Sequence, residues 1–159
     1  MNLPVSPQAG LTAQAPDILR TSPPHREFRL GAKGIVVRHQ QVLLTKERRT
    51  NGTTFWTLPG GGVRPDESIL TGLKREFREE LSVTIATQSL LGTCTYDHAS
   101  RPTTTSVYFV FDCSLTGQPH PNGRDDIIDA QWKDIGDLPR TLIDSFDRFL
   151  TNIDGLWLS

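Results

Sequence analysis

The sequence predicts one mixed α/β domain, in which a mixed β-sheet is flanked by helices. The chain has 159 residues, and a compact domain takes roughly 100–200 residues, so the length allows one domain and little else. Apolar stretches typical of strands come first, an amphipathic helical stretch follows, and further strands and a second helix complete the order. Strands and helices in this order favour a sheet with helices packed on its faces.

The charge balance and the cysteines exclude several function classes. Seventeen Lys and Arg against eighteen Asp and Glu give a formal net charge of −1, so no overall basic field indicates nucleic acid or an anionic membrane as a partner. No apolar run reaches the roughly 18–20 residues of a membrane span, and no secretory signal pattern is present. We therefore expect a cytoplasmic protein. Cys94 and Cys113 lie in apolar stretches and are expected to be buried and reduced.

Residues 1–25 are expected to form a flexible N-terminal arm. They contain several prolines among Ser, Thr, Ala and Gln, with neither a helical nor an alternating pattern. The folded domain is expected to span residues 26–159.

The strand candidates are short apolar stretches bounded by turn residues. The first two are separated by the polar pair His39-Gln40 and predict a hairpin. In the stretch Ser106–Leu115, alternation predicts one face fully in the core, formed by Val107, Phe109, Phe111 and Cys113. The expected strands cover Phe28–Arg38, Gln41–Lys46, Phe55–Leu58, Val83–Ala86, Leu90–Tyr96, Ser106–Leu115 and Ile128–Trp132.

The strongest helix prediction covers Ser68–Leu81. Asp66 or Ser68 can cap its start. Gly72 inside the helix costs about 1 kcal/mol relative to Ala, so it indicates close packing at that turn. A second amphipathic helix is expected over Thr141–Thr151. The apolar stripes of the two helices are Leu70, Leu73, Phe77 and Leu81, and Leu142, Phe146, Phe149 and Leu150.

Three glutamates, Glu76, Glu79 and Glu80, share one face of the first helix. Such a cluster is unfavourable without a compensating cation, because like charges at i,i+4 repel and the last turn of a helix disfavours anions. One interpretation is a solvated face balanced by Arg75 and its neighbours, and the other is a site for a hard divalent cation. The run Pro59-Gly60-Gly61-Gly62 lies just upstream of this helix and can bring main-chain groups close to a bound ligand.

These residues resemble the Nudix hydrolase family. The match runs Gly61, five residues, Glu67, seven residues, then Arg75-Glu76-Phe77-Arg78-Glu79-Glu80-Leu81-Ser82-Val83. Ser82 is the one departure, because the family has glycine there, and a glycine would suit a left-handed residue at the helix end. Stretches on both sides of the motif are also similar to the family, namely Trp56-Thr57-Leu58-Pro59 before it and Ile128–Trp132 and Asp137-Leu138-Pro139 after it.

The resemblance implies an α/β/α sandwich that hydrolyses a nucleoside diphosphate linked to another group and requires Mg²⁺ or Mn²⁺. The implied metal ligands are Glu76, Glu79 and Glu80, with the carbonyl of Gly61 and also Asp129 as further candidates. Arg75 would orient Glu79, and Glu67 would connect the glycine loop to the helix. The general base stays open between Glu79, Glu80 and Asp129.

Substrate contacts are assigned to cationic, aromatic and glycine positions around the motif. The candidates are Arg29, Lys46, Arg48, Trp56, Gly60 and Gly61. For each cation taken alone a surface role is also open, and for Trp56 a core role. Tyr96 is a further candidate to stack on a base, and His98 lies in a polar loop.

The substrate expected is a small nucleotide, with no nucleic acid or membrane partner, and a homodimer is left open. The family's markers for ADP-ribose and dinucleoside polyphosphates are a proline or a tyrosine at a set distance after the motif, whereas this chain has Ala99 and Ser100 there. This absence favours a nucleoside triphosphate, oxidised forms included. The alternatives are ADP-ribose, another nucleotide sugar or a dinucleotide, and a non-catalytic module that senses a nucleotide on the same fold.

Overall fold

The computed structural model describes residues 25–124 and 126–157. The expected N-terminal arm therefore lies, except for His25, outside the described residues. Ten elements follow one another as β1 Glu27–Ile35, β2 Val37–Arg38, β3 Gln41–Arg48, β4 Thr54–Thr57, β5 Gly60–Gly62, α1 Ile69–Leu81, β6 Thr84–Asp97, β7 Thr104–Thr116, β8 Ile127–Asp134 and α2 Asp144–Trp157.

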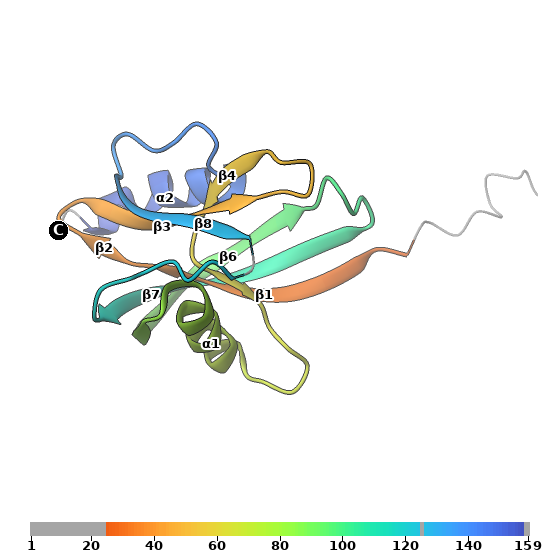
Figure 1. Ribbon diagram of the computed structural model, residues 1–159, viewed down its shortest axis with the longest axis horizontal. Helices are drawn as coiled ribbons and strands as arrows, with labels where there is room; N and C mark the ends of the chain where they lie inside the picture. The colour runs from red at the N-terminus through yellow and green to blue at the C-terminus, as the bar shows by residue number, and fades with distance from the viewer. Residues whose placement is uncertain (1–24, 125, 158–159) are drawn as a thin grey trace, which may run out of the picture.

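The strands form two sheets. The first is mixed, in the order β5-β1-β7-β6, with β1 parallel to β7 and antiparallel to β5. In the second, β3 pairs with β2 and β4 and also with β8. The helices α1 and α2 lie on opposite sides of the first sheet (Figure 1). The predicted mixed sheet flanked by helices is confirmed.

The expected hairpin between the first two strands is much shorter than predicted. Only Val37 and Arg38 pair with β3, while β1 belongs to the other sheet. His39 and Gln40 both take positive φ, 49° and 62°, which is the conformation of a two-residue hairpin turn. The strand therefore divides at Val36, and this division places Lys33 of β1 in the centre of the first sheet.

Two other strand predictions need correction. The expected strands Val83–Ala86 and Leu90–Tyr96 are, apart from Val83, parts of one continuous strand, β6, which has two irregularities in its register with β7. In β7 the expected core face is only partly buried, whereas Val110 on the opposite face is fully buried. Both faces of β7 are covered because α1 lies over one and α2 over the other.

The first helix follows the sequence prediction closely. Ser68 is the N-cap and accepts a hydrogen bond from Thr71 N at 3.1 Å. A Cβ at Gly72 would lie 2.9 Å from Glu67 Oε1, which explains the glycine inside the helix. Ser82 takes the left-handed conformation, φ 57°, that the family's glycine would adopt.

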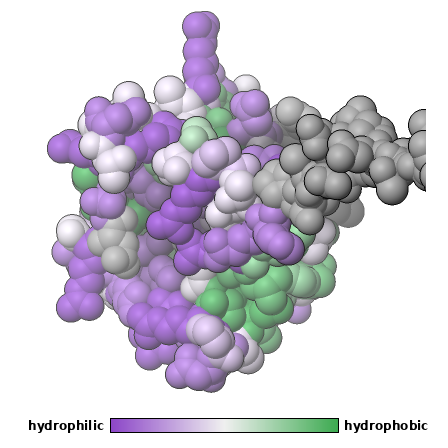
Figure 2. All heavy atoms as spheres, turned by 90° about the vertical axis from the view of Figure 1, so that its right-hand side faces the viewer, coloured by the Kyte–Doolittle hydropathy of each residue, from purple (hydrophilic) through white to green (hydrophobic). Residues whose placement is uncertain are grey.

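Leu70 is the exception on the apolar stripe of α1. Leu73, Phe77 and Leu81 are fully buried, but Leu70 is 39% exposed. In the first turn Ile69 packs instead against the buried cluster that contains Leu73, Phe77 and Leu81. Phe28 and Leu30, at the start of β1, are also exposed, and Figure 2 shows apolar surface at this end of the molecule.

The core consists of one cluster on each side of the first sheet. On the α1 side Leu73 and Phe77 pack against Ala32 and Cys113, and on the α2 side Phe146 and Leu150 join a second cluster. Cys94 and Cys113 are both buried thiols, as expected. Within the described ranges, no helix has the length and apolar character needed to cross a membrane.

Candidate active site

The glycine loop consists of Gly60–Gly62, which form β5. This short strand pairs with β1 and lies close to Glu76 of α1. Gly60 lies opposite Lys33, and Gly61 lies opposite Ala32, in the antiparallel pairing of β5 with β1. Gly60 has φ 123°, and a Cβ there would collide with Ala32 O. A Cβ at Gly61 would lie 2.9 Å from the carboxylate carbon of Glu76. Glycine is therefore required because main chain and carboxylate approach each other here.

Arg75 of α1 connects the glycine loop to this helix through hydrogen bonds. Its guanidinium donates to Glu67 Oε1 at 2.6 Å and to Glu67 Oε2 at 3.0 Å, in a bidentate ion pair. It also donates to Gly62 O at 3.0 Å. Hydrogen bonds from Arg75 and from Arg64 N lower the pKa of Glu67 to about 2. The predicted connection of the loop to the helix through Glu67 is thus present in the structure.

The same guanidinium contacts two of the helix carboxylates. Arg75 Nη1 lies 2.8 Å from Glu76 Oε1 and 3.0 Å from Glu79 Oε2. The other oxygen of Glu79 lies 3.6 Å from Arg64. Arg75 is thus hydrogen-bonded to Glu79, and its role as the residue that orients Glu79 stays a prediction.

Glu80 turns inward from the helix and is 3% exposed. Its Oε2 accepts a hydrogen bond from Gly60 N at 3.1 Å. Burial raises the pKa of Glu80 to about 8, against the opposing effects of Lys33 and of this hydrogen bond. Burial also raises the pKa of Glu76. Both carboxylates are therefore poorly compensated in the protein alone.

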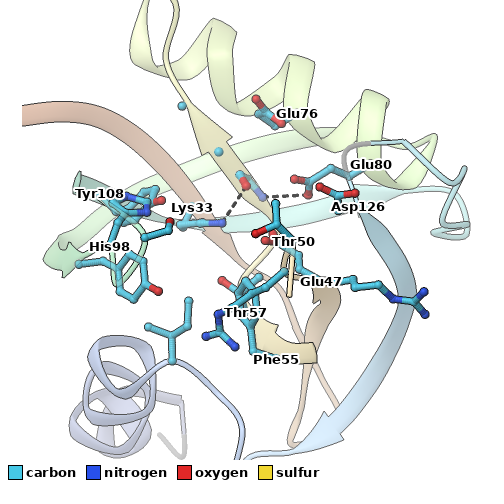
Figure 3. Close-up of a pocket in the computed structure, with 18 of the residues that line it drawn as sticks. Lys33, Glu47, Thr50, Phe55, Thr57, Glu76, Glu80, His98, Tyr108 and Asp126 are labelled. Atoms are coloured by element: carbon cyan, nitrogen blue, oxygen red, sulfur yellow. Dashed lines mark hydrogen bonds between the residues drawn. The ribbon is translucent and has the colours of Figure 1, made fainter. Parts of the chain in front are cut away.

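Several charged residues of the site were missed by the sequence analysis, among them Lys33, Glu47, Arg64 and Asp126. Lys33 is 4% exposed and donates from Nζ to Gly60 O at 2.8 Å. Glu47 of β3 and Asp126 before β8 face the same space as the helix glutamates (Figure 3). A lysine within the apolar stretch Leu30–Val37 was the available signal. No sequence signal pointed to Glu47 or Asp126, because only strand pairing brings these two residues to the site.

Lys33 is charged despite its burial. Desolvation acts to lower its pKa, but Tyr108, Glu47, Glu80 and Glu76 together raise it above the ordinary value. Burial likewise raises the pKa of Glu47, with Lys33 acting in the opposite direction. The site therefore contains several carboxylates around one buried ammonium group.

These groups line a cavity of about 860 Å³ with two chemically different ends. One end is acidic and holds the carboxylates of α1 and the glycine loop. The other end has the rings of His98 and Tyr108 (Figure 3), and the ring of Tyr96 also lines the cavity. His98 Nε2 lies 2.7 Å from Ser106 Oγ, and its ring stands edge-on to Tyr96. A ligand with a polyanionic part and a planar part would match both ends.

The structure brings most, but not all, of the predicted site residues together. The predicted residues that line the cavity are Arg48, Gly60, Gly61, Arg75, Glu76, Glu79, Glu80 and the stacking candidate Tyr96. Glu67 does not line the cavity itself but is hydrogen-bonded to Arg75, which does. Besides Glu67, four predicted residues do not line it: Arg29, Lys46, Trp56 and Asp129.

Each of these four has other surroundings. Trp56 is 7% exposed within the core, and the ammonium of Lys46 lies 5.6 Å from its ring centroid. Asp129 accepts hydrogen bonds from Ala130 N and from Gln131 Nε2. Arg29 is exposed near the start of β1, and burial together with the charge of Arg29 lowers the pKa of His98.

The donor atoms fit a hard divalent cation. Glu76, Glu79 and Glu80 offer carboxylate oxygens, and Glu47 and Asp126 face them across the cavity; oxygen donors of this type suit Mg²⁺ or Mn²⁺. In the part of the chain that the structure describes, no three acidic or histidine side chains already converge at one point. Arg75 occupies one oxygen of Glu76 and one of Glu79, which leaves the second oxygen of each side chain for a cation.

Comparison with known proteins identifies the class. A family model described as NUDIX domain matches residues 27–152, so the chain belongs to the Nudix family. It is 37% identical over 97 residues to a MutT-like protein of Streptomyces ambofaciens, covering 61% of this chain and 57% of that protein. It is 30% identical over 112 residues to an ADP-ribose pyrophosphatase of Methanocaldococcus jannaschii, covering 70% and 64%.

A solved structure agrees with this assignment. The MutT NUDIX hydrolase from Burkholderia pseudomallei superposes with a TM-score of 0.72 at 26% identity, covering 80% of this chain and 99% of that one. The chain spans less than two thirds of the length of the two curated relatives above.

Proposed function

We propose that the protein hydrolyses the diphosphate bond of a nucleoside diphosphate linked to another group, with Mg²⁺ or Mn²⁺ as cofactor. The observation that supports this most strongly is the buried carboxylate of Glu80, bonded to Gly60 N beside Glu76 and Glu79. A group of acids in this position would repel a diphosphate unless a cation lay between them. The aromatic end of the cavity gives the nucleoside a surface on which to stack.

Glu76, Glu79 and Glu80 would hold the cation, and the carbonyl of Gly61 is a further ligand candidate. The bound cation would neutralise charge that develops on the phosphoryl oxygens. Arg75 keeps Glu79 in position through its 3.0 Å hydrogen bond. Glu67 in turn keeps Arg75 in position.

The general base must reach a water molecule beside the diphosphate. Of the three acids open for this role, Asp129 does not line the cavity and Glu80 is 3% exposed. Glu79 lines the cavity with 26% of its side chain exposed. We therefore assign Glu79 as the base: water attacks one phosphorus atom, its proton passes to Glu79, and the bond from that phosphorus to the bridging oxygen breaks.

A nucleoside triphosphate, in normal or oxidised form, is the substrate that we favour. The support is the pair Ala99-Ser100, which stands where the family's markers for ADP-ribose and dinucleoside polyphosphates would be. Both residues line the cavity. ADP-ribose is the second candidate, because the relative from Methanocaldococcus jannaschii is an ADP-ribose pyrophosphatase.

Product analysis tests the reaction and the substrate together. The purified protein would be incubated with nucleoside triphosphates, nucleotide sugars, dinucleotides and dinucleoside polyphosphates, with Mg²⁺ or with EDTA. We expect one class to be cleaved, only with metal. If nothing is cleaved while a nucleotide raises the melting temperature, the hydrolase proposal is wrong and the protein is a nucleotide-sensing module.

A further inference from the structure

Lys33 is a buried cation whose hydrogen-bonding capacity is mostly unused. An ammonium group has three N–H donors. In the part of the chain that the structure describes, Lys33 makes one hydrogen bond, to Gly60 O at 2.8 Å, and no ion pair. Buried ammonium groups are strongly disfavoured unless paired. Two donors of Lys33 thus remain for a group that enters the cavity.

The position of Lys33 indicates what that group is. Its ammonium lies between the acidic end, where it contacts Gly60, and the aromatic end, where it lies 5.2 Å from the Tyr108 ring centroid (Figure 3). In a nucleoside diphosphate, the phosphoryl group attached to the nucleoside lies between the planar base and the rest of the anion. Its oxygens would therefore fall nearest to Lys33.

The same ammonium affects cation binding at the helix carboxylates. Its charge acts on Glu47, Glu76 and Glu80, so without substrate it partly compensates these acids. A divalent cation that binds there is repelled by Lys33, and a phosphoryl group between them would replace that repulsion with attraction on both sides. Metal and substrate would consequently bind more tightly together than separately.

We propose that Lys33 binds the phosphoryl group next to the nucleoside, and that until this group arrives it weakens cation binding at Glu76 and Glu80. The inference rests on the proposed function for the nature of the substrate. It makes Lys33 a substrate-binding residue and also the source of coupling between the metal and nucleotide sites.

The test compares Lys33→Met with the wild type in two binding measurements. Methionine keeps the length of the side chain and removes its charge. Mn²⁺ binding to the substrate-free protein is measured by the loss of the free-ion paramagnetic resonance signal. Binding of α,β-methylene-ADP, whose bridging oxygen is replaced by carbon, is then measured by calorimetry at saturating Mn²⁺. Lys74→Met, which removes an exposed lysine from α1, is the matched control.

We expect Lys33→Met to bind Mn²⁺ at least tenfold more tightly, because the positive charge of Lys33 repels the ion over several ångströms even at an effective dielectric of about 20. We expect the same variant to bind the methylene analogue at least tenfold more weakly. Lys74→Met should match the wild type in both. The proposal is overturned if Lys33→Met binds Mn²⁺ no more tightly than the wild type, or binds the analogue equally well.

Lys33→Arg tests whether a change in Mn²⁺ affinity comes from loss of the charge or from a general disturbance of the fold. Arginine keeps the positive charge, so Mn²⁺ affinity should stay within about threefold of the wild type. A gain in Mn²⁺ affinity in this variant as well would overturn the proposal, since it would then arise from repacking. Melting temperatures of all variants establish that they are folded.

Failure of this inference differs from failure of the proposed function. If the wild type hydrolyses a nucleotide with metal but Lys33→Met shows neither binding change, the role of Lys33 alone is wrong. If the wild type cleaves nothing while both changes are present, Lys33 acts as proposed in a protein that only binds nucleotides.

Discussion

Arg75 and Lys33 are two cations of one site with opposite surroundings. Arg75 makes hydrogen bonds to Glu67, Glu76, Glu79 and Gly62 O. Lys33 has one hydrogen bond, to Gly60 O, although it is more deeply buried. Arg75 thus has partners within the chain, whereas Lys33 and the nearby Glu80 lack strong ones.

The difference separates what holds the site together from what binds ligands. A satisfied bidentate ion pair fixes the geometry of the loop and the helix. Buried charges with few hydrogen bonds, such as Lys33 and Glu80, can gain further partners when ligands bind. Breaking the pair of Arg75 with Glu67 should therefore reduce stability. Removing the charge of Lys33 or Glu80 should change ligand binding, and at Glu80 it should not reduce the stability of the metal-free protein.

The largest expected effect is on catalysis. Glu79→Gln should lower kcat by a factor of about 10²–10⁴, because it removes the proposed base. The melting temperature should change little, since Gln can still accept from Arg75. Steady-state kinetics on the substrate found by product analysis would measure this. Asp129→Asn is the matched control, and an equal loss there would show that the base has been misassigned.

Glu67→Gln should have the largest effect on stability. Breaking the bidentate pair leaves Arg75 with a weaker partner and should cost about 1–3 kcal/mol, which lowers the melting temperature by several degrees in a domain of this size. The pKa of Glu67 is lowered to about 2, so its contribution is full above pH 4.5 and is lost as the pH falls towards 2.

Melting curves of both proteins between pH 7 and pH 3 test this expectation. The difference between wild type and Glu67→Gln should narrow as the pH falls. A difference that stays constant with pH would mean that the charge of Glu67 is unimportant for stability.

Glu80→Gln should raise the melting temperature, in contrast to Glu67→Gln. Burial raises the pKa of Glu80 to about 8, so the folded protein keeps a proton that the unfolded chain releases near pH 4.5. The wild type without metal therefore loses stability as the pH rises from about 4.5 to 8. Glu80→Gln lacks this loss and should melt a few degrees higher at pH 8.5 in EDTA. An equal or lower melting temperature would show that Glu80 is better compensated than its surroundings indicate.

The Arg75 region was predictable from sequence, whereas the Lys33 region was not. Glu67, Arg75 and Glu79 lie on or next to one helix, so fixed spacing determines which of them meet. Lys33, Glu47 and Asp126 come together only because β1 joins one sheet and β3 pairs with β8 in the other.

The same reasoning explains the incorrect hairpin and the placement of Asp129. A local pattern predicts that a stretch is extended, but it does not predict its partner strand. Asp129 lies opposite Lys46 in the pairing of β8 with β3, and its carboxylate is bonded within its own strand. Only the sheet register determines whether Asp129 lines the cavity, because the sequence pattern is the same whether it lines the cavity or not.

The smallest effect concerns the helix that carries both regions. Ser82 ends α1 with φ 57°, a conformation that costs a residue with a Cβ roughly 1 kcal/mol. Ser82→Gly should therefore raise the melting temperature by about 2–4 °C, while Ser82→Ala, which keeps the Cβ, should not. Activity should be unchanged in Ser82→Gly, because Arg75 and the glycine loop rather than the helix end hold Glu79 and Glu80. A loss of activity with a gain in stability would mean that the strained helix end itself positions the carboxylates, and the division between the Arg75 and Lys33 regions would then be incomplete.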